Sequence, residues 1–65
     1  MPIIDITLLE GRSPADKVAL VRAVTDACVE SIGAPRETVR IMIRELPLEH
    51  YAVGGVPKKM PPGVD

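Results

Sequence analysis

The fold is decided by the stretch IIDITLLEGRSPAD (residues 3–16), which passes from a strand to the start of a helix. Residues 3–9 are largely apolar on both alternating faces, as is typical of a strand that is covered on both sides. The next three residues, 10–12, form a short connector. Ser13 and Pro14 then predict a helix N-terminus, with Ser13 as N-cap and Pro14 at the first helical position.

The helix that begins here carries one apolar stripe. Its members are Val18, Leu20, Val21, Val24, Ala27, Cys28 and Ile32. Their spacing of three and four residues predicts one helical face packed against a sheet, with Lys17 among the outer charged positions. Gly33 and Pro35 predict that the helix ends near residue 32.

A second strand is predicted over residues 38–46, where the side chains alternate in character. One face of this strand carries Val39, Ile41 and Ile43, and the other carries Arg40, Met42 and Arg44. A strand, a helix and a strand in this order predict two parallel strands with a right-handed crossover. Gly54-Gly55 predicts a hairpin turn, and residues 56–65 form a proline-rich tail. We therefore expect an α/β fold in one domain (1–65), a single β-α-β unit with parallel strands plus a short C-terminal hairpin.

The length of the chain predicts that this unit is completed by oligomerisation. A chain of 65 residues buries only ~60% of its unfolded surface, and two strands with one helix do not close a core. One cysteine and one histidine exclude an intrachain disulfide and a structural zinc site. Because 46% of the residues are hydrophobic, apolar surface remains for other subunits.

The charge balance excludes several classes of partner. Eight basic and nine acidic residues give a formal net charge of −1, so no long-range field attracts nucleic acid or an anionic membrane. No apolar run approaches the roughly 20 residues of a membrane-spanning helix, and the start lacks the basic region of a signal peptide. We expect a cytoplasmic protein with no nucleic-acid or membrane partner.

Pro2 is the residue that most needs a functional explanation. Methionine before a small residue is generally removed, and loss of Met1 would leave a secondary amine at the head of an apolar strand. An α-amino group titrates near ~8 in reference peptides, and apolar surroundings disfavour its charged form. Such an amine suits a general base that moves a proton at neutral pH. The alternative is an ordinary strand-starting proline behind a retained Met1.

Arginines are the expected companions of such a base. Proton transfer beside a carbonyl needs cations that hold an acidic substrate and stabilise the developing enolate. Arg12 follows the carboxyl end of the first strand, where open α/β folds place ligands. Arg40 lies on the second strand on the face opposite Ile41, and Arg44 shares that face as an equally plain candidate. Each of these arginines also fits the role of a surface charge.

Several segments together resemble the small 4-oxalocrotonate tautomerases over about residues 2–55. They are Pro2-Ile3-Ile4, Leu9-Glu10-Gly11-Arg12-Ser13, Ala34-Pro35, Val39-Arg40-Ile41 and His50-Tyr51-Ala52-Val53-Gly54-Gly55. The resemblance implies a β-α-β subunit in a homo-oligomer, a hexamer built from dimers, with each active site at a subunit boundary. It also implies a tautomerase that needs no cofactor and no metal.

By this resemblance Pro2, freed of Met1, is the base that converts a 2-hydroxydienoate such as 2-hydroxymuconate, a product of aromatic ring fission, into its keto form. Arg12 would hold a carboxylate of this enol acid. Arg40, from a neighbouring chain, would stabilise charge at the 2-oxygen and the near carboxylate.

The resemblance also places Leu9 and Tyr51 beside the substrate. Tyr51 stands where the family commonly has a phenylalanine that keeps the proline in an apolar setting, so its hydroxyl is a departure. Leu9 stands near the position where relatives that hydrate haloacrylates carry a second arginine. His50 is expected to be a structural loop residue, and Lys58 and Lys59 a solvated pair.

A catalytically silent subunit is the alternative reading of the same residues. In that case the chain would keep Met1 and serve as a structural or binding member of an oligomer. The state of the N-terminus distinguishes this alternative from a tautomerase.

Overall fold

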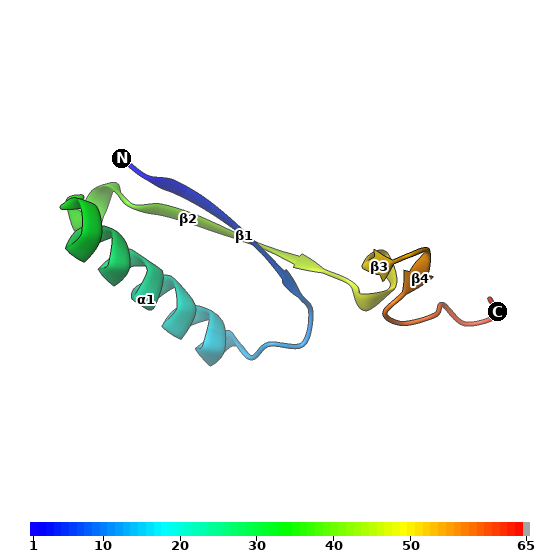
Figure 1. Cartoon of the computed structure of the whole chain (residues 1–65). Coiled ribbons are helices and arrows are strands. Elements are labelled where there is room, and N and C mark those ends of the chain that lie inside the picture. The colour runs from blue at the N-terminus through cyan, green and yellow to red at the C-terminus, as the bar shows by residue number, and fades with distance from the viewer. Residues whose placement is uncertain (65) are drawn as a thin grey trace.

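The computed structural model describes residues 1–64. Its elements are β1 (Ile3–Leu9), α1 (Pro14–Ile32), η1 (Arg36–Thr38), β2 (Arg40–Leu46), η2 (Leu48–His50), β3 (Ala52–Val53) and β4 (Val56–Pro57). β1 and β2 run parallel along their full length, as the sequence predicts, with α1 as the connection between them (Figure 1). No helix in this part of the chain is long and apolar enough to cross a membrane.

The two ends of α1 are fixed by the residues that the sequence indicates. The Ser13 side chain accepts a hydrogen bond from the Asp16 N–H at 3.1 Å, which satisfies one of the free amides of the first turn. Gly33 has φ of 66°, and its N–H donates to the Val29 carbonyl at 3.1 Å. A side chain at Gly33 would be strained in this left-handed conformation, so the glycine ends the helix.

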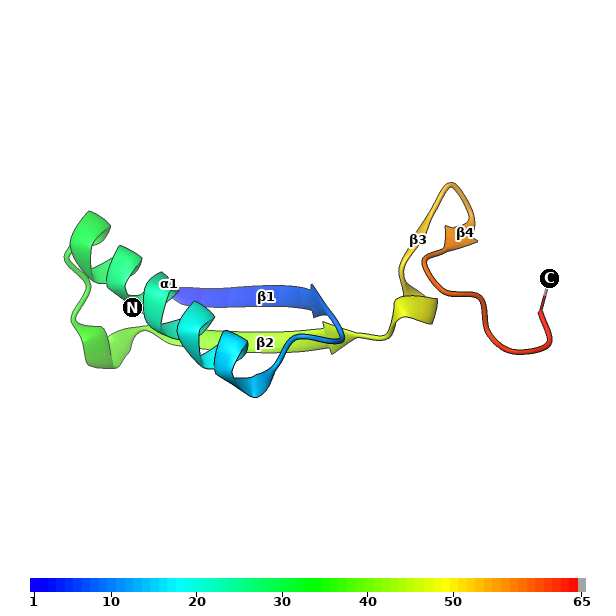
Figure 2. The ribbon, with the colours of Figure 1, turned by 90° about the horizontal axis from the view of Figure 1, so that it is seen from below.

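The helix packs on one face of the two-stranded sheet, but its inward face differs from the predicted stripe (Figures 1 and 2). Val18 is 44% exposed, and Ile32 is exposed as well. The Lys17 side chain is only 27% exposed, and its Nζ lies 3.0 Å from Glu45 of β2. The prediction that Lys17 faces outward is therefore wrong. Lys17 is one turn before Val21 on the inner face, whereas Val18 is rotated by about 100° to its flank.

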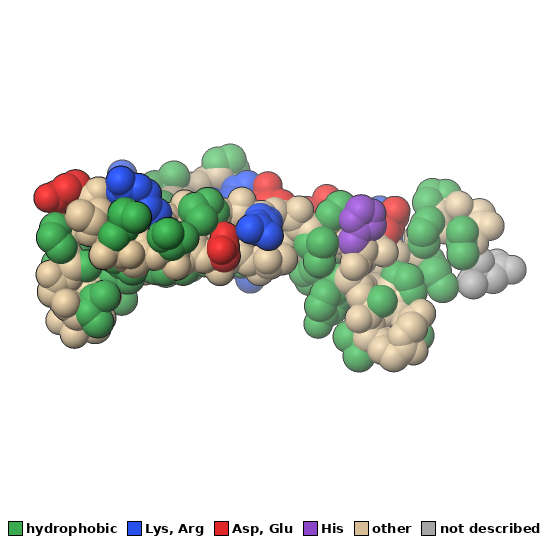
Figure 3. Space-filling view, turned by 90° about the horizontal axis from the view of Figure 1, so that it is seen from above, with side chains coloured by type: hydrophobic (Ala, Val, Ile, Leu, Met, Phe, Trp, Pro, Cys, Tyr) green, Lys and Arg blue, Asp and Glu red, His purple; other side chains and the backbone are tan. Residues whose placement is uncertain are grey.

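The opposite face of the sheet is uncovered. Ile3 is 60% exposed and Met42 41% exposed on this face, and Arg44 forms an ion pair with Asp5 at 3.4 Å. Figure 3 shows hydrophobic side chains at the surface of both the β-α-β part and the hairpin end.

The chain has almost no interior of its own. Among the described residues only Ala34, at 8% exposure, is buried, and no large side chain is fully buried. The Cα radius of gyration is 15.9 Å, against about 11 Å for a compact chain of this length. A single chain is thus an extended building block whose apolar surface needs other subunits to cover it.

The C-terminal hairpin extends beyond β2, away from α1 (Figures 1 and 2). β3 and β4 pair antiparallel, with Ala52 opposite Pro57. Gly54 and Gly55 have φ of 60° and 84°, the two positive values that a tight type I′ turn requires. The short hairpin is confirmed. The sequence assigns Pro57 to the irregular tail, but it lies in β4, since a two-residue edge strand does not need the missing N–H.

Candidate active site

Pro2 and Arg40 lie together at the amino end of the sheet. The parallel register places Ile3 opposite Arg40, and the Arg40 N–H donates to the Pro2 carbonyl at 3.0 Å. Pro2 is half-buried, whereas Met1 is exposed. The Arg40 guanidinium donates to the Glu37 carbonyl at 2.8 Å through Nη1. In the Met1–Pro2 peptide bond the proline nitrogen is an amide without a basic lone pair, so its basicity depends on removal of Met1.

Leu9 and Arg12 lie at the other end of β1, in an open groove of about 510 Å³ that we call the carboxyl-end groove. It is lined by Thr7, Leu8, Leu9, Glu10, Gly11, Arg12, Asp16, Leu48 and Lys58. Glu10 accepts a hydrogen bond from the Leu48 N–H at 3.3 Å through Oε1. This contact ties η2 to the loop after β1 and so fixes one wall of the groove.

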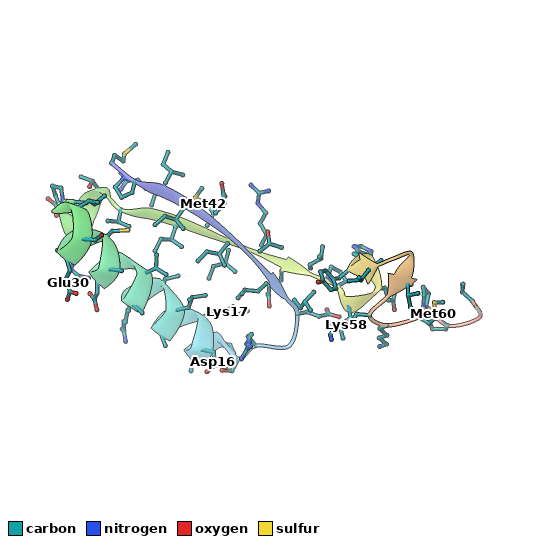
Figure 4. All side chains as sticks on the ribbon, in the orientation of Figure 1. Asp16, Lys17, Glu30, Met42, Lys58 and Met60 are labelled. Atoms are coloured by element: carbon teal, nitrogen blue, oxygen red, sulfur yellow. The ribbon has the colours of Figure 1, made fainter. Side chains whose placement is uncertain are left out.

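Tyr51 lines a second, more apolar groove of about 320 Å³ on the hairpin, the hairpin groove. Its other lining residues are Val53, Val56, Pro57 and Lys58. The Lys58 N–H donates to the Tyr51 carbonyl at 2.7 Å. Lys58 lines both grooves and lies where the hairpin approaches the loop after β1 (Figure 4).

The residues that the sequence predicts for the site therefore fall into two groups within one chain. Pro2 and Arg40 are at the amino end of the sheet; Leu9, Arg12 and Tyr51 are at or beyond its carboxyl end. The seven residues of β1 span about 23 Å at the usual rise of a strand. One chain does not bring the two groups together, and the roles of these five residues stay predictions.

Lys58 is one of the lining residues that the sequence did not assign to the site. We expected Lys58 and Lys59 to be a solvated pair, but the structure places Lys58 in the walls of both grooves. The only signal in the sequence is Gly54-Gly55, because a hairpin turn there brings the following residues back beside Tyr51. Within residues 1–64 no group of three or more His, Cys, Asp or Glu side chains is arranged to hold a metal ion.

Known proteins resemble this chain over most of its length. Residues 2–60 match the family described as "Tautomerase enzyme". The chain is 51% identical over 65 residues to a probable tautomerase from Ralstonia nicotianae, with 95% of this chain and 93% of that one covered. It is 46% identical over 57 residues to a 2-hydroxymuconate tautomerase from Pseudomonas putida, covering 88% and 90%.

A solved structure agrees with the fold as well. It is a chain of the heterohexameric 4-oxalocrotonate tautomerase from Chloroflexus aurantiacus J-10-fl, which superposes with a TM-score of 0.83 at 40% identity and covers 89% of this chain and 94% of that one.

Proposed function

The chain belongs to the tautomerase family, and from this membership we propose that it interconverts the enol and keto forms of a small 2-hydroxydienoate such as 2-hydroxymuconate. The observation that carries the proposal is Pro2, half-buried at the head of β1 directly behind an exposed Met1. Aromatic ring fission is the class of chemistry that yields such enol acids. The cytoplasmic location predicted from the sequence is part of this proposal.

Pro2 acts as the general base once Met1 is removed. Its neutral secondary amine takes the proton from the 2-hydroxyl of the substrate, and the electron pair left on oxygen forms the C2 carbonyl. The C2–C3 double bond moves to C3–C4, and the electrons of C4–C5 take up the proton at C5 from the protonated amine. The amine returns to its starting state, and the reaction needs no oxidant or reductant.

The two arginines and two further lining residues complete the proposed site. Arg12 binds the carboxylate remote from the hydroxyl, because a guanidinium forms paired hydrogen bonds with it. Arg40 stabilises the negative charge that develops on the 2-oxygen. Leu9 and Tyr51 line the space around the diene.

We further propose that each site is built from more than one chain of a homo-oligomer, a hexamer built from dimers. A small dienoate is much shorter than the roughly 23 Å of β1, so Pro2 of one chain and Arg12 of another must meet around it. The uncovered sheet face with Ile3 and Met42 supplies apolar surface for such contacts. The heterohexamer described for the Chloroflexus relative supports an assembly of this size.

The test is the activity of Pro2→Ala on 2-hydroxymuconate, followed by ultraviolet absorbance. The variant replaces the secondary ring amine with the primary amine of alanine, and this poorly positioned base is expected to lower kcat by roughly 10²- to 10⁴-fold. Pro62→Ala is the matched control, since Pro62 is exposed in the tail. Intact mass of the purified protein shows whether Met1 has been removed. Near-normal activity of Pro2→Ala, or a retained Met1 in an active enzyme, contradicts the proposal.

A further inference from the structure

The charges that line the carboxyl-end groove balance only because Lys58 is present. Glu10 and Asp16 contribute two negative charges, and Arg12 and Lys58 contribute two positive charges. Without Lys58 the groove would carry one net negative charge, and a substrate carboxylate would approach Arg12 against it. Lys58 thus removes the repulsion that the two acidic residues would cause.

Both cations are available to a ligand. The ion pairs formed within residues 1–64 use Lys17, Arg36 and Arg44 as their basic partners, and neither Arg12 nor Lys58 is among them.

The two acidic side chains of the groove already have favourable positions. Glu10 accepts the Leu48 N–H, and Asp16 lies in the first turn of α1, where the helix dipole favours a carboxylate. Arg12 and Lys58 are consequently the charged groups of this groove that an incoming anion can bind.

The backbone holds Lys58 at the boundary between the two grooves. Its N–H bond to the Tyr51 carbonyl, at 2.7 Å, fixes the residue directly after β4. Lys58 therefore borders the polar groove with Arg12 and the apolar groove with Tyr51 at once. A dienoic acid matches this arrangement, because its carboxylate suits the charged groove and its diene suits the apolar groove.

We propose that Lys58 is a second substrate-binding cation, which acts with Arg12 to select dicarboxylates over monocarboxylates. This inference rests on the proposed function for its reaction, but it concerns binding and is measured without turnover. Lys58 is not a catalytic base or acid here; it contacts the carboxylate that lies far from the reacting hydroxyl.

The experiment uses the full assembled enzyme and two unreactive probes of matched shape. trans,trans-Muconate carries two carboxylates, and sorbate carries one on a diene of the same geometry. Calorimetric titration compares wild type with Lys58→Gln, Lys58→Arg and Lys59→Gln. Lys59 is the matched control, since it is adjacent and exposed but lines neither groove.

We expect Lys58→Gln to weaken muconate binding about fivefold, the size of an ion pair partly open to solvent. Sorbate binding should weaken less in that variant, because sorbate has no carboxylate left for Lys58 when its single carboxylate lies at the opposite end of the site. Lys58→Arg should keep the preference for muconate, and Lys59→Gln should match wild type. Equal weakening of both probes, no weakening of muconate, the same effect at Lys59, or failure of wild type to bind muconate overturns the inference.

Turnover measured on the same samples separates this inference from the proposed function. If wild type binds muconate through Lys58 but does not convert 2-hydroxymuconate, the tautomerase substrate is wrong and the binding role stands. If conversion depends on Pro2 but muconate binding does not depend on Lys58, only the role of Lys58 is wrong.

Discussion

The position of Arg12 in the groove predicts how much its removal should weaken substrate binding. Arg12 is exposed, forms no ion pair within residues 1–64 and lines the carboxyl-end groove with Leu9. A charge-assisted hydrogen bond to a carboxylate contributes about 1.5–3 kcal/mol. Arg12→Ala should therefore lower kcat/KM for 2-hydroxymuconate by roughly ten- to a hundredfold, mainly through a higher KM, in steady-state kinetics.

Arg22→Ala is the control for this change. Arg22 is an exposed arginine of α1 and lines none of the grooves described above. Its removal should leave KM within the error of measurement. Comparable losses in both variants would mean that Arg12 acts through the overall charge of the protein and not by binding the carboxylate.

At the scale of an element, the N-cap of α1 provides a stability test. Ser13→Ala removes the acceptor of the Asp16 N–H and should lower the free energy of unfolding by about 1 kcal/mol per chain. Urea denaturation at one fixed protein concentration measures the change. Ser31→Ala is the control, since the Ser31 hydroxyl only donates to the Ala27 carbonyl in its own helix. A loss at Ser31 equal to that at Ser13 would argue against the capping role.

The sequence correctly predicts the elements whose ends and turns are set by residues close together in the chain. Ser13 and Gly33 define the ends of α1 through contacts within a few residues, and Gly54-Gly55 makes its turn through its own backbone freedom. Alternating side chains assign the faces of the strands in the same way.

The features that the sequence did not reveal depend on partners far along the chain. Lys17 lies on the inner face because its Nζ pairs with Glu45 of β2, 3.0 Å away. A lysine stem can lie along apolar surface while its charge is paired. Lys58 lines the groove because the hairpin turn returns the chain beside Tyr51, where the Lys58 N–H donates to the Tyr51 carbonyl. The spacing of residues along the sequence does not reveal either of these contacts between distant segments. The separation of Pro2 from Arg12 likewise appears only when the length of β1 is seen in space.

For the whole molecule, the separation of Pro2 from Arg12 predicts complementation between two inactive variants. Each site is proposed to take Pro2 from one chain and Arg12 from another. When Pro2→Ala and Arg12→Ala chains are unfolded together and refolded as mixed oligomers, about one quarter of the sites should regain both residues by random assembly. Activity on 2-hydroxymuconate should rise toward that fraction of the wild-type value.

The control mixture contains Pro2→Ala and the double variant with Pro2→Ala and Arg12→Ala. No site in this mixture recovers Pro2, so its activity should stay at the background level. Native mass spectrometry verifies that both mixtures contain mixed oligomers. Absence of recovery in verified mixed oligomers would place Pro2 and Arg12 of one site on the same chain.

The lack of an interior has a consequence for the protein in the cell. A copy in which only Ala34 is buried among the described residues leaves its backbone open to proteases. We therefore expect newly made copies that do not assemble to be degraded, so that the amount of protein depends on how soon the copies meet one another. A substitution at a subunit contact would be detected first as missing protein in an immunoblot, while the messenger RNA level stays normal.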